Sequence, residues 1–333
     1  MVQDMRKVNR KKERRYLVPL LFILNVFLWG SAIYLWLQNV DMPPSVTDNF
    51  AVAAEIYVPE TRQPTVLQPN DALTYEDVNV EIHSSTALLI NLDTGEILFD
   101  HGGNTRVYPA SITKIMTVLV GLEHARSDEV TIYADFDALF RAQSAMAGFE
   151  NGEIRTLSEV LYASMLASGG DATTSLAYHV AGSYQGFVDL MNETAMRLEM
   201  ENTHFTNASG LHDDNHYTTA YDTALLLGYA LTHTHFREIF TAPTYSFINS
   251  AGNEQFVSST MFLNMSTTEF NGGEILGGKT GFTTPAGLCL ASIATDGVNE
   301  FALITFGAPT DGTTPPANIR DAFALYEYFF GLD

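Results

Sequence analysis

The chain has 333 residues, of which 46% are hydrophobic, so it can bury a substantial core in one or two domains. Its formal net charge of −22 argues against nucleic acid and anionic lipid headgroups as partners. The single cysteine, Cys289, excludes an internal disulfide, and the surrounding apolar run GLCLASIA predicts a buried structural thiol.

The N-terminal segment differs from the rest of the chain in charge. Residues 1–15 contain seven Lys or Arg residues, whereas residues 16–38, YLVPLLFILNVFLWGSAIYLWLQ, contain no Asp, Glu, Lys or Arg. A helix of this length, at about 1.5 Å per residue, spans a bilayer core of roughly 30 Å. Because the basic cluster precedes the apolar run, we expect a cytoplasmic tail at 1–15, a single-pass membrane anchor at 16–38 and an extracytoplasmic remainder. The alternative is a cleaved signal peptide, whose apolar region is normally about 7–15 residues long.

The sequence pattern of the remaining residues predicts a linker followed by one domain. Residues 39–77 are polar, contain several prolines and show no sustained period, which is typical of a linker. TALLINL and EILFD around Gly95 predict a β-hairpin, and a helix is predicted to begin near Pro109. Mainly helical patterns fill residues 150–235, three strand patterns occupy residues 274–308, and NIRDAFALYEYFFGL predicts a final helix. Residues 78–333 therefore predict an α+β domain, in which an antiparallel sheet is covered by helices and carries a mainly helical insertion.

The stretch YPASITKIMT places Ser111 one helical turn before Lys114, at a predicted helix start. Residues three apart on a helix are neighbours, so the amine of Lys114 can reach the hydroxyl of Ser111. A deprotonated lysine can take the serine proton, which is one known way to activate a nucleophile. The pair alone is weak evidence, because most Ser-x-x-Lys spacings have no function.

Two further stretches carry polar groups suited to a site. GGKTGFT, at a strand, contains Lys279 and Thr280, which could bind a carboxylate, and Gly281, which lets a ligand approach the backbone. SGGDA contains Ser168, which could relay a proton to a leaving group. The simpler interpretations are a glycine-rich turn with a solvated lysine, and a helix N-cap formed by Ser168 or Asp171.

In this order, Ser-x-x-Lys, a Ser-containing loop and Lys-Thr-Gly form the motif set of penicillin-binding proteins and class A β-lactamases. Together with DTGEILFD, NASGLHDDNHYTTAYD and GGKTGFTTPAGLCLASIA, they resemble the serine D-alanyl-D-alanine carboxypeptidases, which are low-molecular-mass penicillin-binding proteins of peptidase family S11. The likeness covers roughly residues 78–330. It implies a β-lactamase/transpeptidase-like fold.

The resemblance implies a role for each matching residue. Ser111 would be the acylated nucleophile, Lys114 its general base and Ser168 a proton shuttle. The backbone N–H groups of Ser111 and Phe282 would form the oxyanion hole. Lys279, Thr280, Gly281 and Phe282 would form the substrate-binding strand. The implied substrate is a peptidoglycan stem peptide ending in D-Ala-D-Ala, β-lactams are the implied inhibitors, and no cofactor is implied.

The sequence departs from the family pattern at Gly170, which stands where the usual Ser-x-Asn motif has its asparagine. We also expect neither the β-rich C-terminal domain nor the amphipathic C-terminal anchor that the family often carries. His212 and His216, with Asp213 and Asp214, might suggest a metal site, but the resemblance explains this block without one, and we expect no metal.

Two alternative functions stay open. A β-lactamase on the same fold would need a deacylating glutamate, usually in Glu-x-x-Leu-Asn, and no such string occurs. A catalytically weak penicillin-binding or sensor protein is supported by Gly170 alone.

Overall fold

A six-stranded antiparallel sheet is assembled from the two ends of the described chain, which comprises residues 67–68 and 72–330 of the computed structural model. The order is β2-β1-β10-β9-β8-β7. The strands are β1 (Thr86–Asn91), β2 (Ile97–His101), β7 (Glu269–Phe270), β8 (Gly273–Thr283), β9 (Gly287–Thr295) and β10 (Glu300–Ala308). The predicted hairpin and the three predicted C-terminal strands are confirmed, and so is the α+β class.

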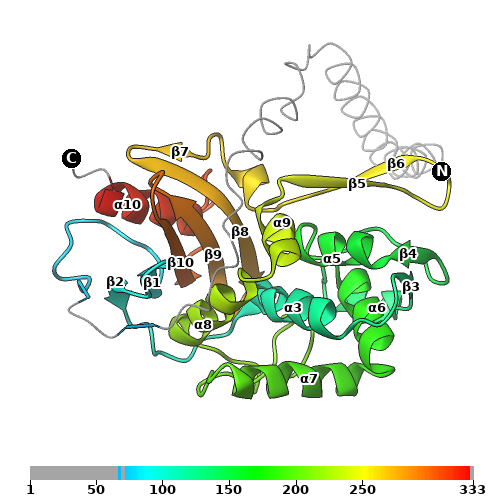
Figure 1. The fold of residues 1–333 in the computed structure, drawn as a ribbon. Coiled ribbons are helices and arrows are strands. Elements are labelled where there is room, and N and C mark those ends of the chain that lie inside the picture. The colour runs from blue at the N-terminus through cyan, green and yellow to red at the C-terminus, as the bar shows by residue number, and fades with distance from the viewer. Residues whose placement is uncertain (1–66, 69–71, 331–333) are drawn as a thin grey trace, which may run out of the picture. The chain divides into compact units, whose positions relative to one another are not determined.

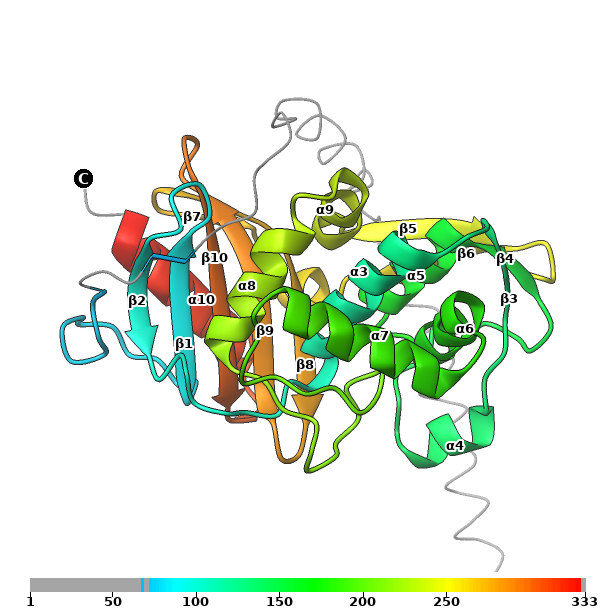
Figure 2. The same ribbon diagram turned by 60° about the horizontal axis from the view of Figure 1, so that its bottom comes forward.

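The two faces of the sheet are covered by different helices (Figures 1 and 2). The predicted last helix, α10 (Ala317–Phe330), packs on β9 and β10, while α8 (Ala220–Ala230) packs on β10 and β1 from the opposite side. Side chains alternate accordingly along β1, where Leu89 contributes to the core under α10 and Leu88 to the core under the other helices. Because both faces are covered, β1 is apolar throughout its middle rather than alternating.

The chain between β2 and β8 forms the predicted helical insertion. It starts with a 3-10 turn, η1 (Ala110–Thr113), which continues directly into α3 (Lys114–His124). Helix α3 contacts five other helices, so its first eight residues are all buried rather than forming a single apolar stripe. The contacting helices are α5 (Leu157–Met165), α6 (Gly170–Ala181), α7 (Tyr184–Arg197), α8 and α9 (Thr234–Thr241).

Several smaller elements were not predicted. They are the helices α4 (Phe136–Arg141) and α9, the paired strands β3 (Glu129–Thr131) and β4 (Ile154–Thr156), the hairpin β5 (Thr244–Ile248) and β6 (Glu254–Ser258), the 3-10 turn η2 (Phe262–Asn264) and the edge strand β7. Short elements such as these hold few periods of any hydrophobic pattern, and α9 carries its apolar residues over only two turns.

The N-terminal predictions lie mainly outside the described residues. This holds for the tail 1–15, the anchor 16–38 and most of the linker 39–77. The described end of the linker is attached to the sheet, since Leu67 is buried and the backbone N–H of Leu73 donates to the carbonyl of Leu98 at 3.1 Å. Across residues 67–68 and 72–330, no helix combines the length and hydropathy needed to cross a membrane.

Candidate active site

Ser111 and Lys114 lie on the turn that joins η1 to α3. The Lys114 Nζ is 3.1 Å from the Ser111 Oγ, as the three-residue spacing predicts. Ala110, just before the serine, has a left-handed backbone with φ of 46°, which an L-residue adopts only at a cost in energy. The chain thus enters the helix through a strained turn that places the serine side chain at the edge of the helical region.

Lys114 is almost completely buried, with 2% of its surface exposed. Its Nζ donates to the backbone carbonyl of Ser209 as well as contacting Ser111. Burial lowers the pKa of Lys114 well below its ordinary value of 10.5, and the charge of the nearby Lys279 lowers it further. The lowered pKa favours the neutral amine of Lys114 over the charged form.

The carbonyl that holds Lys114 belongs to a loop built by Asn207. The Asn207 Oδ1 accepts hydrogen bonds from the backbone N–H groups of Ser209, Gly210 and Leu211, at 3.1, 2.7 and 3.1 Å. Gly210 has φ of +82°, and a Cβ there would lie 1.9 Å from the carbonyl oxygen of Ala110. The NASGLH stretch is thus a folded support for the lysine, which the sequence analysis did not identify.

Strand β8 forms the opposite wall. Lys279 is 1% exposed, its Nζ donates to the carbonyl of Thr280 at 2.8 Å, and burial lowers its pKa to about 7. The Thr280 hydroxyl lies 2.5 Å from that of Thr260. Gly281 lies close to the turn that carries Ser111, since a Cβ at residue 281 would lie 2.9 Å from the backbone nitrogen of Ser111. The next side chain, Phe282, is 52% exposed.

Ser168 lies in the turn before α6, with 6% of its surface exposed and a left-handed φ of 58°. Its hydroxyl has no hydrogen-bond partner among the described residues. The suggested N-cap is wrong for both candidates: the N-cap of α6 is Gly169, and the Asp171 carboxylate instead accepts the backbone N–H groups of residues 147–149 at 2.8–3.0 Å. The Ser168 hydroxyl is therefore left available for a ligand.

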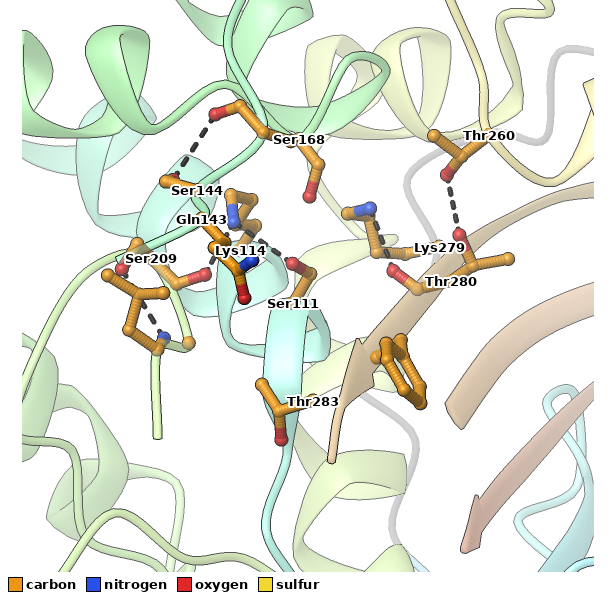
Figure 3. A pocket seen from close by; sticks show the side chains of 14 residues that line it. Ser111, Lys114, Gln143, Ser144, Ser168, Ser209, Thr260, Lys279, Thr280 and Thr283 are labelled. Atoms are coloured by element: carbon orange, nitrogen blue, oxygen red, sulfur yellow. Dashed lines mark hydrogen bonds between the residues drawn. The ribbon is translucent and has the colours of Figure 1, made fainter. Parts of the chain in front are cut away.

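One pocket of about 230 Å³ brings these groups together. Of the predicted residues, it is lined by Ser111, Lys114, Ser168, Lys279, Thr280 and Phe282, whereas Gly170 and Gly281 are not among its lining residues. Figure 3 shows Ser111 between Lys114 on one side and Lys279 on the other. The pocket is also lined by residues that the sequence analysis missed, namely Gln143, Ser144, Ala145, Ser209, Gly210, Leu211, Thr260 and Thr283.

His216 contacts the 3-10 turn η1, on which Ser111 lies. It is 1% exposed, its Nδ1 accepts the backbone N–H of Thr206 at 2.9 Å, and its Nε2 lies 2.8 Å from the Thr113 hydroxyl. Burial lowers the pKa of His216 to about 4. The described residues contain no group of three or more His, Cys, Asp or Glu side chains placed to hold a metal ion.

Cys289 is fully buried on β9, as its apolar surroundings predict. Burial raises the pKa of its thiol to about 12, so the group stays protonated and unreactive near pH 7.

The chain is similar in sequence to known proteins. The family model described as D-alanyl-D-alanine carboxypeptidase, peptidase S11, matches residues 72–310. The chain is 32% identical over 253 residues to the D-alanyl-D-alanine carboxypeptidase DacF of Bacillus subtilis, covering 73% of this chain and 63% of that protein. It is 30% identical over 241 residues to DacC of Escherichia coli, covering 67% of this chain and 56% of that protein.

The chain is also similar in fold to solved structures. The Streptomyces K15 DD-transpeptidase superposes with a TM-score of 0.67 at 26% identity, covering 76% of this chain and 98% of that one. A D-alanyl-D-alanine carboxypeptidase from Mycobacterium tuberculosis gives a TM-score of 0.67 at 26% identity, covering 80% and 97%. The chain spans less than two thirds of the length of the first two curated relatives. On these matches, the chain belongs to the D-alanyl-D-alanine carboxypeptidase family, peptidase S11.

Proposed function

We propose that the protein is a membrane-anchored serine D,D-carboxypeptidase that removes the terminal D-Ala from peptidoglycan stem peptides. The observation that carries this proposal is the 3.1 Å contact between Ser111 and a buried lysine with a strongly lowered pKa, inside a pocket. The family membership supports the substrate class, because the matching relatives are named D-alanyl-D-alanine carboxypeptidases.

The first step is acylation of Ser111. Neutral Lys114 takes the proton of the Ser111 hydroxyl while its amine stays oriented by the carbonyl of Ser209. The serine oxygen attacks the carbonyl carbon of the penultimate D-Ala, and the C–N bond to the last D-Ala breaks. The leaving amine receives a proton by way of Ser168, whose buried hydroxyl has no partner within the described part of the chain. Water then hydrolyses the ester and restores the serine.

The negative charge that develops on the carbonyl oxygen needs donors already in place. The backbone N–H groups of Ser111 and Phe282 serve as this oxyanion hole. The missing side chain at Gly281 supports the assignment, because it lets β8 approach the backbone nitrogen of Ser111 closely.

The free carboxylate of the substrate binds at β8. Lys279 and the Thr280 hydroxyl supply a cation and a donor on the far side of Ser111 from the base (Figure 3). A bound carboxylate raises the pKa of Lys279, since an opposite charge favours the protonated amine. Substrates with an amidated C-terminus should therefore react more slowly.

The test is release of D-alanine from diacetyl-Lys-D-Ala-D-Ala by the full chain purified in detergent. We expect release by the natural protein, and single penicillin labelling that is absent in Ser111→Ala and strongly reduced in Lys114→Ala. Penicillin labelling that survives in Ser111→Ala would refute the site. Rapid hydrolysis of penicillin without cleavage of the peptide would indicate a β-lactamase. Penicillin labelling without hydrolysis of either penicillin or the peptide would indicate a binding or sensor protein.

The membrane placement rests on the sequence pattern of residues 1–38. We expect residues 16–38 to remain as an uncleaved single-pass anchor and Ser111 to face the outside, where peptidoglycan lies. A topology reporter fused after residue 75 should be active only outside the cytoplasm, and cytoplasmic activity would refute this placement.

A further inference from the structure

Gln143 occupies an unusual backbone position next to the candidate active site. Helix α4 ends in a Schellman motif, in which the N–H of Ser144 donates to the carbonyl of Leu139 at 2.9 Å and the N–H of Gln143 to that of Phe140 at 3.0 Å. Gln143 is the left-handed residue of this motif, with φ of 54°. Glycine is the usual residue there because a Cβ is strained in this conformation. Glutamine therefore stands at a position where the backbone conformation alone favours glycine.

This side chain points into the pocket. Figure 3 shows the Gln143 amide beside Ser111 and Lys114, on the opposite side of Ser111 from Lys279 and Thr280. It is the one carboxamide among the residues that line the pocket in the described part of the chain. The side chain is exposed, so its amide is accessible to a ligand.

The loop that carries Gln143 is fixed to the turn that carries Ser168. The backbone N–H of Gly170 donates to the carbonyl of Ala145 at 2.7 Å, and the Asp171 carboxylate accepts three consecutive backbone N–H groups from residues 147–149. Asp171 is fully buried, which strengthens these charge-assisted hydrogen bonds. Hydrogen bonds to Gly170 and Asp171 therefore hold in place the loop that carries Gln143.

Gly170 makes this arrangement possible. A Cβ at Gly170 would lie 2.3 Å from the Ser144 hydroxyl oxygen and 3.1 Å from the Leu139 Cδ2. A side chain at residue 170 therefore requires the Ser144 hydroxyl to rotate and the side chains of Leu139 and Ser144 to shift slightly. Without a side chain at 170, the amide on this wall of the pocket comes from Gln143.

We propose that the Gln143 amide is a specificity-determining group that donates a hydrogen bond from Nε2 to the amide carbonyl on the acyl side of the bound substrate. This inference rests on the proposed function. A peptide whose terminal carboxylate meets Lys279 directs its acyl portion toward the opposite wall, where Gln143 lies. The ligand class is thus an acyl donor with an amide bond next to the acylated residue, as in a peptide or an acylaminopenicillin.

The test compares two acylating reagents on the full chain in detergent. Penicillin G carries an acylamino carbonyl next to its reactive ring, whereas 6-aminopenicillanic acid has a free amine there. Gln143→Gly, Gln143→Ala and Gln143→Glu should each acylate with penicillin G about tenfold more slowly, because one hydrogen bond to the carbonyl is lost. Acylation by 6-aminopenicillanic acid should change by less than about twofold in Gln143→Gly and Gln143→Ala.

The melting temperatures of the variants distinguish a ligand-binding role of Gln143 from a purely structural role. Gln143→Gly should raise the melting temperature by about 2 °C, because glycine relieves the left-handed strain, while still losing penicillin G reactivity. Glu199 provides the matched control: it has φ of 58° in the equivalent position at the end of α7, away from the pocket. Glu199→Gly should gain similar stability and react normally with both reagents.

Equal slowing with both reagents would overturn the proposal, since it would place the effect of Gln143 on Ser111 and Lys114. Unchanged reactivity with both reagents would also overturn it, while leaving the proposed function intact. Failure of the proposed function is a separate result, in which the natural protein releases no D-alanine from diacetyl-Lys-D-Ala-D-Ala.

Discussion

Replacing Gly170 by asparagine restores the residue type that the family motif normally has, yet the structure predicts that this change is harmful. A Cβ at position 170 would start 2.3 Å from the Ser144 hydroxyl oxygen and 3.2 Å from the Ser144 Cβ. Rotating the Ser144 hydroxyl away removes only the first contact. The helix start or the loop at 142–145 must therefore shift, although Gly170 is bonded to that loop through the carbonyl of Ala145.

The size of the effect follows from overpacking. Forcing extra atoms into a packed site costs typically about 1–3 kcal/mol, which lowers the melting temperature of a domain of this size by roughly 3–9 °C. Displacement of the loop also moves Gln143 and Ser168, so peptide hydrolysis should fall by roughly tenfold or more. Thermal unfolding and D-alanine release, measured on the same preparations, provide the assay.

A double-mutant cycle identifies the cause. Ser144→Gly removes both contacts with residue 144 and leaves the 3.1 Å contact with the Leu139 Cδ2. Gly170→Asn should therefore destabilise the Ser144→Gly background less than the natural chain, with a coupling energy of about 1 kcal/mol or more. Ser144→Ala should rescue only part of the loss, because it keeps the Cβ. Hydrolysis roughly a hundredfold faster in Gly170→Asn would refute this reasoning and show that the natural site lacks a donor of the kind that oxyanion holes use.

Three further predictions concern other parts of the site. Because Lys279 has a pKa of about 7 and must be charged to bind a carboxylate, kcat/KM for the peptide should fall as the pH rises above about 7; a flat profile up to about pH 9 would contradict this role. Gly281→Ala places a methyl group 2.9 Å from the backbone nitrogen of Ser111, so penicillin acylation should slow by roughly ten- to a hundredfold, and an unchanged rate would exclude a tight oxyanion hole. His216 has a folded-state pKa of about 4 and an unfolded value of 6.5, so it contributes about 3 kcal/mol to the free energy of unfolding above pH 6.5 and loses this contribution as the pH falls to 4. The free energy of unfolding of His216→Gln should lack this part of the pH dependence, and parallel curves for the two proteins would contradict the prediction.

The elements that the sequence predicted are those with strong local signals. The hairpin around Gly95, the strands of residues 274–308 and helices α5 to α8 each repeat an apolar pattern over several periods or contain a clear turn. Helix α4 and the β5–β6 hairpin do not: α4 has six residues and buries only Leu139, and both hairpin strands leave apolar side chains exposed. Tertiary contacts rather than local pattern determine those segments.

The candidate site was predicted unevenly for a similar reason. Ser111, Lys114, Ser168 and Lys279 belong to short motifs with fixed spacing, and all four line the pocket. The role of Asn207 depends on loop hydrogen bonds, and the position of Gln143 depends on how α4 ends; neither has a spacing that identifies it in the sequence. The suggestion that Asp171 caps a helix failed because its carboxylate binds a loop more than twenty residues earlier in the chain.

Strained backbone marks the site independently of any motif. Four residues other than glycine have positive φ in the described chain: Ala110, Gln143, Ser168 and Glu199. Gln143 and Ser168 line the pocket, and Ala110 directly precedes Ser111, which also lines it, whereas Glu199 lies at the end of α7 and does not line the pocket. Strain of this kind persists only where the surrounding contacts enforce it. Here the enforcing contacts are identified: Gly210 against the carbonyl of Ala110, and Gly170 and Asp171 against the loop that follows Gln143.

The two buried lysines complete the chemical argument. Both lose solvation in the same pocket, and the charge of Lys279 disfavours a proton on Lys114, so the site resists holding two protons at once. Lys114 has the more strongly lowered pKa because the charge of Lys279 adds to its burial. A substrate carboxylate that contacts Lys279 stabilises the proton on that side chain. The single proton shared by the two lysines therefore stays on Lys279 and not on Lys114. Under the proposed function, binding of the carboxylate therefore leaves Lys114 neutral beside Ser111 for the acylation step.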